Sequence, residues 1–428
     1  MEEGQSKVID IHLLRKGMFI QLDLGWMDHP FSLSSFKIAT DDQIQTIVAL
    51  GLKTIRFFPE RSDPDPDTHP APDSVPPVID EAAGGRSRGG HHEEHRQAYQ
   101  FAAQRRRLAA CERQFTDAAR RYRRVAETVL QSPQLARDDV AGLVGGCVDE
   151  LLANEESVIR LLSESIGERS SQHPVNVMVV SLLLGQALDM DRDSLMQLGI
   201  AALLHDVGKL ELPDRFRSAD ENFTATEYRL YQEHVARSLA VASRMGLSSE
   251  AVAGIAQHHE MVDGSGFPAR LTGDQMQLCG KILALVNRYD NFCNPARAVV
   301  ALTPHEALSV IFAQMKARFD PVVLSAFIRM MGVYPPGSVV QLGNDRYALV
   351  VSVNSTRPLR PKVIVHDPAV PRGEAMVADL ETMPELGIRR SLKPSQLPKA
   401  ALDYLSPRTR ICYFFERAVD AAAPGDAA

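Results

Sequence analysis

The chain contains 428 residues, 45% of them hydrophobic, and carries a formal net charge of −7 with a pI near 6.0. This length predicts a globular protein of roughly two or three domains, and the acidic balance argues against a general nucleic-acid-binding protein, which usually presents a basic face. The five cysteines form no CxxC pair, the N-terminus is polar and unlike a signal peptide, and no apolar run is long enough to span a membrane, so we expect a cytoplasmic protein.

The first 60 residues predict a small α/β module. Apolar and polar residues alternate from Ile9 to Leu24, Asp41–Leu50 has helical spacing, and Thr54–Phe58 is typical of a returning strand. We interpret residues 1–60 as a small regulatory module.

The next segments predict a linker and then a helix. Residues 61–95 are rich in Pro, Asp and Gly and cannot bury a core, so we expect a disordered linker. The Arg-, Ala- and Gln-rich sequence from Arg96 to Gln131 has few helix breakers and predicts a long, polar, solvent-exposed helix. We therefore expect a connecting helix over residues 96–140.

Residues 141–332 are overwhelmingly helical in pattern, beginning with a helix from Ala141 to Leu162. After Pro335-Pro336-Gly337 the pattern changes to short β-type runs, which extend over Ser338–Leu342, Tyr347–Val353 and Lys362–Val365. We expect a small β-rich C-terminal domain over residues 333–420.

Histidines and carboxylates recur along the helical body. The candidate metal ligands and their neighbours are His173, His205, Asp206, His234, His258, His259, Asn287 and Asp290. Such side chains on facing helices can converge on a pair of divalent ions in a bundle core. A bridging carboxylate such as Asp206 would hold two ions about 3.5–4 Å apart, which suits in-line phosphoryl displacement. Each histidine alone is more often a packed or surface residue than a ligand, but their recurrence together favours metal binding.

The most specific motif is HHEMVDGSGFP, from His258 to Pro268. At these residues the chain resembles the HD-GYP family, the subgroup of HD phosphohydrolases with the signature HHExxDGxGYP. LLHDVGKLELP, from Leu203 to Pro213, and FDP, from Phe319 to Pro321, match two further family motifs. The resemblance covers about residues 150–332, and the N-terminal 60 residues resemble the small domain of unknown function that often precedes HD-GYP domains.

The resemblance implies a mainly α fold: an HD-type helical bundle with a small N-terminal α/β module and a small β-rich C-terminal appendage. It implies a metal-dependent phosphodiesterase that hydrolyses c-di-GMP to linear pGpG, to GMP or to both, in bacterial second-messenger signalling. It also implies two divalent ions, commonly iron or manganese, with the ligands His173, His205, Asp206, His234, His258 and His259.

The resemblance assigns roles to further residues as well. Lys209 matches the family lysine that meets a substrate phosphate, so Lys209 and Asp206 are the expected catalytic residues; a plain surface lysine is the alternative. The loop with Asp263, Gly264 and Gly266 would shape the rim that faces guanine, although a simple tight turn would also explain its glycines. The expected partners are c-di-GMP, a signalling protein such as a diguanylate cyclase, and a second copy of the chain in a homodimer.

Three positions depart from the family pattern. Asn287 stands where the family has Asp and would offer a metal only a neutral oxygen. Phe267 replaces the signature tyrosine, and residues 294–297 replace a basic stretch that contacts the dinucleotide, leaving Arg297 as a partial substitute. These departures keep open a second interpretation, in which an inactive protein serves as a c-di-GMP receptor or an interaction scaffold. An HD hydrolase of another phosphoester is a third.

Overall fold

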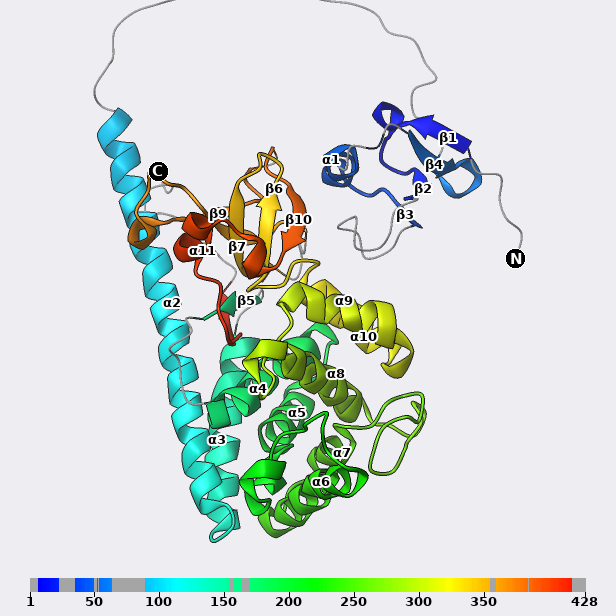
Figure 1. The fold of residues 1–428 in the computed structure, drawn as a ribbon, viewed down its shortest axis with the longest axis vertical. Coiled ribbons are helices and arrows are strands. Elements are labelled where there is room, and N and C mark those ends of the chain that lie inside the picture. The colour runs from blue at the N-terminus through cyan, green and yellow to red at the C-terminus, as the bar shows by residue number, and fades with distance from the viewer. Residues whose placement is uncertain are drawn as a thin grey trace, which may run out of the picture.

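The computed structural model describes residues 7–22, 35–49, 52, 54–63, 89–153, 157–162, 169–354, 359–383 and 385–417. Helices dominate, with one small sheet near the N-terminus and a larger one near the C-terminus, which confirms the expected fold class (Figure 1). Within the described residues, no helix combines the length and apolar character needed to cross a membrane.

The N-terminal module is a four-stranded antiparallel sheet with one short helix. Its strands lie in the order β1 (Lys7–Asp10), β4 (Thr54–Phe58), β2 (Phe19–Gln21) and β3 (Ser35–Lys37). Helix α1 (Asp41–Ala49) places Ile47 in a small apolar cluster with Ile20 and Ile55. The predicted α/β module is therefore confirmed, with its helix and its last strand at the expected residues.

Helix α2 (Gly89–Thr128) is long, as expected, but it is solvent-exposed on one side only, so the expectation of a fully exposed helix was wrong. It packs against α3 (Pro133–Leu152), α4 (Arg169–Ala187) and β11 (Tyr413–Arg417), and Figure 1 shows α3 alongside it. Buried side chains recur along it every three or four residues: Cys111, Phe115, Ala118, Tyr122 and Val125. This apolar stripe between the arginines turns one side of α2 toward the core.

The start of α2 also corrects the expected linker. Gly89 to His95 lie within the helix, whereas residues 61–95 were expected to be disordered. Residues 64–88 of that stretch lie outside the described residues.

The helical body is built around α4. Its other helices are α5 (Arg192–Leu204), α6 (Ala225–Met245), α7 (Ser249–Gln257), α8 (Leu278–Cys293), α9 (Pro304–Met315) and α10 (Pro321–Met331). Residues 174–185 of α4 are all buried, and α4 contacts α5, α8, α10 and β11. Side-chain caps set several helix starts; Thr224 and Glu227, for example, form a capping box at α6.

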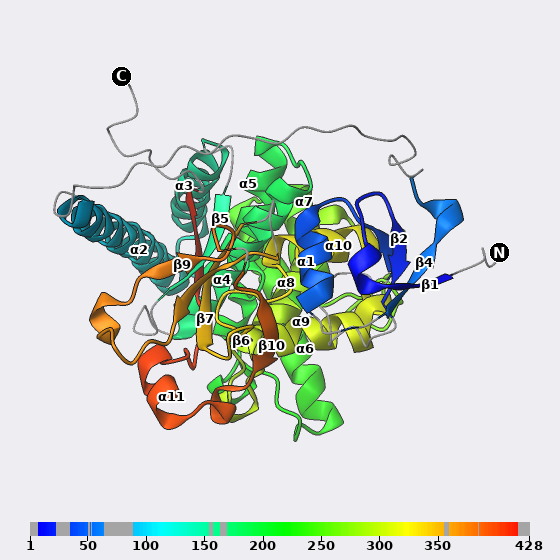
Figure 2. The same ribbon diagram turned by 90° about the horizontal axis from the view of Figure 1, so that it is seen from above.

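The C-terminal sheet takes one strand from the start of the helical body. Its main path runs β10 (Ile388–Leu392), β6 (Val339–Leu342), β7 (Tyr347–Asn354), β5 (Ser157–Leu161) and β11, while β8 (Lys362–Val365) pairs with β7 and β9 (Val377–Asp379). Strand β5 lies between β7 and β11 and is antiparallel to both. The view from above shows this sheet over the helical body (Figure 2), and β11 contacts α4.

Strand β5 corrects the helix that was expected from Ala141 to Leu162. Helix α3 ends at Leu152, and residues 157–161 form β5 instead. Val158 and Ile159 are buried there because β-branched side chains pack well on a pleated sheet. Pairing with β7 and β11 therefore makes this short apolar segment a strand, although the sequence around it has a helical pattern.

Candidate metal centre

Helix ends and one helix face bring six of the candidate ligands together. His173 lies in the first turns of α4, His205 caps the C-terminus of α5, His258 caps the C-terminus of α7, and His234 lies within α6. These side chains form two groups that share Asp206, and within each group the possible ligand atoms lie within 4.8 Å of one another. The first group consists of His173, His205 and Asp206, and the second of Asp206, His234, His258 and His259.

Asp206 divides its two oxygens between these groups. Its Oδ2 lies 3.5 Å from His173 Nε2 and 3.4 Å from His205 Nε2. Its Oδ1 lies 3.4 Å from His234 Nε2 and 3.6 Å from His258 Nε2. Each oxygen thus faces its own pair of imidazoles, which is the arrangement that a carboxylate bridging two cations requires.

One of these oxygens is left without a partner. Asp206 Oδ1 is buried and accepts no hydrogen bond in the described part of the chain. An unsatisfied buried carboxylate oxygen is costly, and a bound cation is a direct way to satisfy it. The donor set therefore fits a metal site better than a packed polar core.

The imidazoles are oriented by their own helices. Nδ1 of His205, His234 and His258 lies 2.6–2.7 Å from the carbonyl oxygen three residues earlier. Donation of the Nδ1 proton to these carbonyls leaves the Nε2 lone pairs free for a metal.

The facing Nε2 atoms have metal-site spacing. They lie 3.2 Å apart for His173 and His205 and 3.3 Å apart for His234 and His258. Two ligands with metal–nitrogen bonds of about 2.1 Å are roughly 3.0–3.4 Å apart in octahedral or tetrahedral geometry. Each pair therefore has the spacing expected of two ligands that bind the same ion.

Asp290 supports His173. Its Oδ2 lies 2.6 Å from His173 Nδ1, while its Oδ1 accepts hydrogen bonds from Asn176 and Asn294. Carboxylates that orient ligating histidines in this way are a recurrent feature of metal sites. The amide oxygen of Asn287 accepts from Asn291 Nδ2 at 2.6 Å, and its role as a metal ligand stays a prediction.

Burial keeps most of the imidazoles neutral. It lowers the pKa of His205 to about 4 and that of His234 to about 3, and it lowers the pKa of His259 well below its usual value. His173 differs: burial lowers its pKa, but hydrogen bonds to Asp206 and Asp290 outweigh burial and raise it to about 9. Neutral imidazoles are the form that binds a metal.

Lys209 lies beside the Asp206 carboxylate. Its Nζ is 2.6 Å from Asp206 Oδ2. Burial opposes both charges, but their mutual attraction outweighs it, so the pKa of Asp206 falls well below its usual value and that of Lys209 rises. Both groups are charged at neutral pH, as their expected catalytic roles require.

A cavity of about 770 Å³ opens onto the cluster, and its lining includes His173, Asp206, Lys209, His258 and His259. This volume lies within the range of about 300–1,000 Å³ that is typical of small-molecule sites.

The predicted guanine-facing loop lies elsewhere. Asp263, Gly264 and Gly266 are not among the residues that line the cavity, although their neighbour Phe267 is, and its ring stacks on His259. At Gly266 a Cβ atom would lie 2.4 Å from the backbone of Glu260, so packing explains this glycine. The buried Glu260 carboxylate in turn accepts hydrogen bonds from three backbone N–H groups, at residues 269–271.

The arginines of the site also differ from expectation. Arg297 does not line the cavity and pairs instead with Glu221 at 2.5 Å. Arg288 and Arg410 do line it, and the motif analysis missed both. Arg288 adjoins Asn287, which could have drawn attention to it, but Arg410 lies far along the chain and no local motif marks it.

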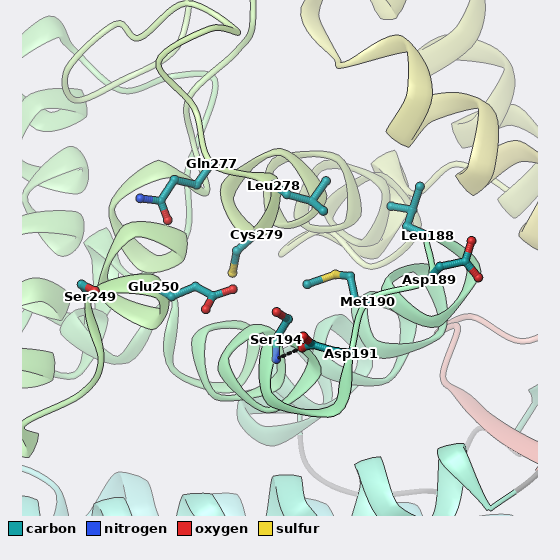
Figure 3. A pocket seen from close by; sticks show the side chains of 10 residues that line it. All are labelled: Leu188, Asp189, Met190, Asp191, Ser194, Ser249, Glu250, Gln277, Leu278 and Cys279. Atoms are coloured by element: carbon teal, nitrogen blue, oxygen red, sulfur yellow. Dashed lines mark hydrogen bonds between the residues drawn. The ribbon is translucent and has the colours of Figure 1, made fainter.

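A second cavity, of about 540 Å³, lies between α5, α7 and the start of α8 (Figure 3). Its lining includes Asp189, Asp191, Glu250 and Cys279, and none of its ten lining residues is basic. This acidic hollow does not suit an anionic ligand.

Sequence comparisons give two family matches. Residues 151–323 match the HD domain family. Residues 6–140 match a domain of unknown function (DUF3391), which extends well beyond the expected 60-residue module and includes all of α2 and the first turns of α3.

Among similar proteins, cyclic di-GMP phosphodiesterase PA4108 of Pseudomonas aeruginosa is 28% identical over 367 residues, which cover 84% of each protein. A cyclic di-GMP phosphodiesterase of Vibrio cholerae is 34% identical over 136 residues, 30% of this chain and 27% of that protein. The 3′3′-cGAMP-specific phosphodiesterase 2 of Vibrio cholerae is 26% identical over 187 residues, 42% of this chain and 35% of that protein. The chain thus spans most of the Pseudomonas protein but only about a third of the two Vibrio proteins.

Proposed function

We propose that this chain, an HD-domain protein of the HD-GYP type preceded by a DUF3391 domain, is a metal-dependent phosphodiesterase that hydrolyses c-di-GMP to pGpG and GMP. The observation that supports it most directly is the division of the Asp206 oxygens between two pairs of imidazoles. The relatives described above are all named phosphodiesterases, so the comparisons lend no support to the non-catalytic receptor.

The proposed centre holds two divalent ions, iron or manganese. The proposed ligands are His173, His205, Asp206, His234, His258 and His259, with Asn287 as a further candidate. Such ions would activate water and neutralise charge on the phosphoryl group. In this arrangement Asp206 fixes the spacing of the two halves, and Asp290 keeps the ring of His173 in place.

Lys209 is proposed to steady the substrate phosphate. Its ammonium group lines the cavity next to Asp206, so a phosphate that reaches the centre also meets a fixed positive charge. The proposed outer rim of the substrate cavity, beyond its lining residues, consists of Arg297 and the loop with Asp263, Gly264 and Gly266.

The remaining proposals concern organisation. The proposed domains are residues 1–60 as a regulatory module, 61–88 as a linker, 89–140 as a connecting helical segment, 141–332 as the HD-GYP domain and 333–420 as the C-terminal domain. The linker ends at residue 88 because α2 begins at Gly89. The chain is proposed to act in the cytoplasm, as a homodimer and with signalling proteins such as a diguanylate cyclase as partners.

Turnover by anaerobically purified, metal-analysed protein tests the function. We expect about two ions per chain and chromatographic conversion of c-di-GMP to pGpG or GMP. Asp206→Asn removes the bridging charge and should lower kcat/KM at least about a thousandfold, with loss of bound metal. Asp191→Asn, which alters only the cap of α5, is the matched control.

Three results would count against the proposal. Fully loaded protein that binds c-di-GMP tightly without forming product would favour the receptor, and Asn287→Asp would then show whether that position causes the inactivity. Faster turnover of 3′3′-cGAMP than of c-di-GMP would change the substrate but keep the enzyme class. Full activity in Asp206→Asn would remove the proposed centre altogether.

A further inference from the structure

Four basic side chains other than histidine line the cavity, and two of them have no acidic partner. Lys209 pairs with Asp206, and Arg217 pairs with Asp214 at 2.7 Å. Arg288 and Arg410 form no ion pair in the part of the chain that the structure describes.

The two arginines without an ion pair among the described residues are far apart in the sequence. Arg288 lies on α8, directly after the buried Asn287, with its guanidinium 5.9 Å from the ring of Phe292. Arg410 lies just before β11 and donates a hydrogen bond of 3.3 Å to Gln172. Gln172 precedes His173, so Arg410 reaches the His173 side of the cluster.

Both arginine residues are half-buried. Partly buried cations without a counter-charge are unfavourable, and an anionic ligand in the cavity would relieve that cost. A guanidinium group also matches the oxygens of a phosphate with two parallel hydrogen bonds.

We propose that Arg288 and Arg410 bind the phosphate of the cyclic dinucleotide that is not being cleaved. This inference rests on the proposed function. A cyclic dinucleotide carries two phosphates, and only one of them can lie at the metal centre and Lys209 at a time. Arg288 and Arg410 provide the positive charge for the other, and they take the role that the motif analysis gave to Arg297. The C-terminal segment that carries Arg410 is then part of the substrate site.

The test compares two substrates in Arg288→Ala and Arg410→Ala. Removing a charge-assisted contact should raise KM for c-di-GMP about ten- to a hundredfold. Bis(p-nitrophenyl) phosphate has a single phosphate, so its hydrolysis should stay within about twofold of the parent chain. Arg192→Ala, which removes a surface arginine paired with Asp149, is the matched control, and Arg297→Ala tests the rival position.

The outcomes separate this inference from the proposed function. A parent chain that neither binds nor hydrolyses c-di-GMP refutes the function, and the inference with it. An active parent chain whose two variants keep its KM for c-di-GMP refutes the inference alone, as does an equal loss on both substrates. Should an alanine variant fail to fold, Arg288→Met and Arg410→Met preserve the packing of the stem and carry the same expectation.

Discussion

Asp206 is the residue on which both halves of the candidate metal centre depend. Among the described residues, it is the one residue that the two ligand groups share, and each group faces a different one of its two oxygens. Lys209 holds the carboxylate ionised, and the geometry leaves Oδ1 unsatisfied within the described part of the chain. The site is thus preorganised around a negative charge that has too few protein partners, which favours cations over a protonated acid.

The buried histidines predict how the metal-free protein responds to acid. The pKa of His205 is about 4 and that of His234 about 3, against about 6.5 in an unfolded chain. The unfolded state therefore binds more protons than the folded state below pH 6.5, so the free energy of unfolding decreases as the pH is lowered. We expect a loss of roughly 1 kcal/mol per histidine for each pH unit between 6.5 and 4.

The contribution of His173 to stability changes with pH in the opposite direction. Its pKa is raised to about 9, so its contribution to stability is complete below pH 6.5 and is lost as the pH rises through 9. Urea unfolding of chelator-treated protein at pH 5.5, 7 and 9.5 measures both effects. His234→Gln should weaken the pH dependence of the unfolding free energy between pH 5.5 and 7 but not that between pH 7 and 9.5. An unchanged dependence below pH 7 in that variant would contradict the lowered pKa of His234.

Sequence motifs were enough to predict the cluster of candidate ligands, but they did not predict which arginines line the cavity. His205-Asp206 and His258-His259 are adjacent in sequence, and each pair ends a helix, so local patterns were enough to select them. Arg410 reaches the cavity only because β11 lies against α4, a tertiary contact that no local pattern encodes. Arg297 was a reasonable choice by position, but in the structure it pairs with Glu221 and does not line the cavity.

At the scale of elements, the same contrast holds for α2 and β5. The helical character of α2 was predictable, but its burial was not, because arginines between the apolar positions lower its mean hydropathy and hide the stripe that includes Phe115 and Tyr122. Strand β5 is short and its apolar run fits a helix or a strand equally well. Pairing with β7 and β11 decided between them.

A hydrogen-bond network joins β11 to the metal centre. The backbone carbonyl of Ile411, just before β11, accepts from Asn294 at 2.8 Å and from Asn176 at 3.2 Å. Both amides also donate to Asp290, which holds His173. The start of β11 is thus linked to His173, a candidate metal ligand, through Asn176 and Asn294 and then Asp290.

This network predicts that Asn294→Ala weakens metal binding without touching a ligand. Loss of such outer support typically costs about ten- to a hundredfold in metal affinity. Competition with a chromophoric chelator measures this directly, independent of activity. Asn344→Ala, at a surface turn, is the control; equal affinities of the two variants would show that the Asn294 contact does not hold His173.

At the scale of the whole molecule, two cores divide the chain. One apolar cluster runs without a break from α2 through the helical body into the C-terminal sheet, and it includes Phe115, Leu203 and Phe415. The other belongs to the N-terminal module and is centred on residues such as Ile20 and Ile47. The C-terminal sheet is therefore structurally part of the body, since β5 and β11 tie its strands to the helices on either side.

These cores predict opposite results for two truncations. Removal of residues 1–63 takes away the smaller core and leaves the larger one whole, so the melting temperature of the remaining body should change by less than about 5 °C and its bound metal should be retained. Removal of residues 333–428 strips β5 of both neighbours and exposes the apolar surface of α4, so that chain should unfold or aggregate. Thermal melts with metal analysis distinguish the two. A stable, metal-loaded protein that lacks residues 333–428 would show that the sheet is a detachable appendage after all.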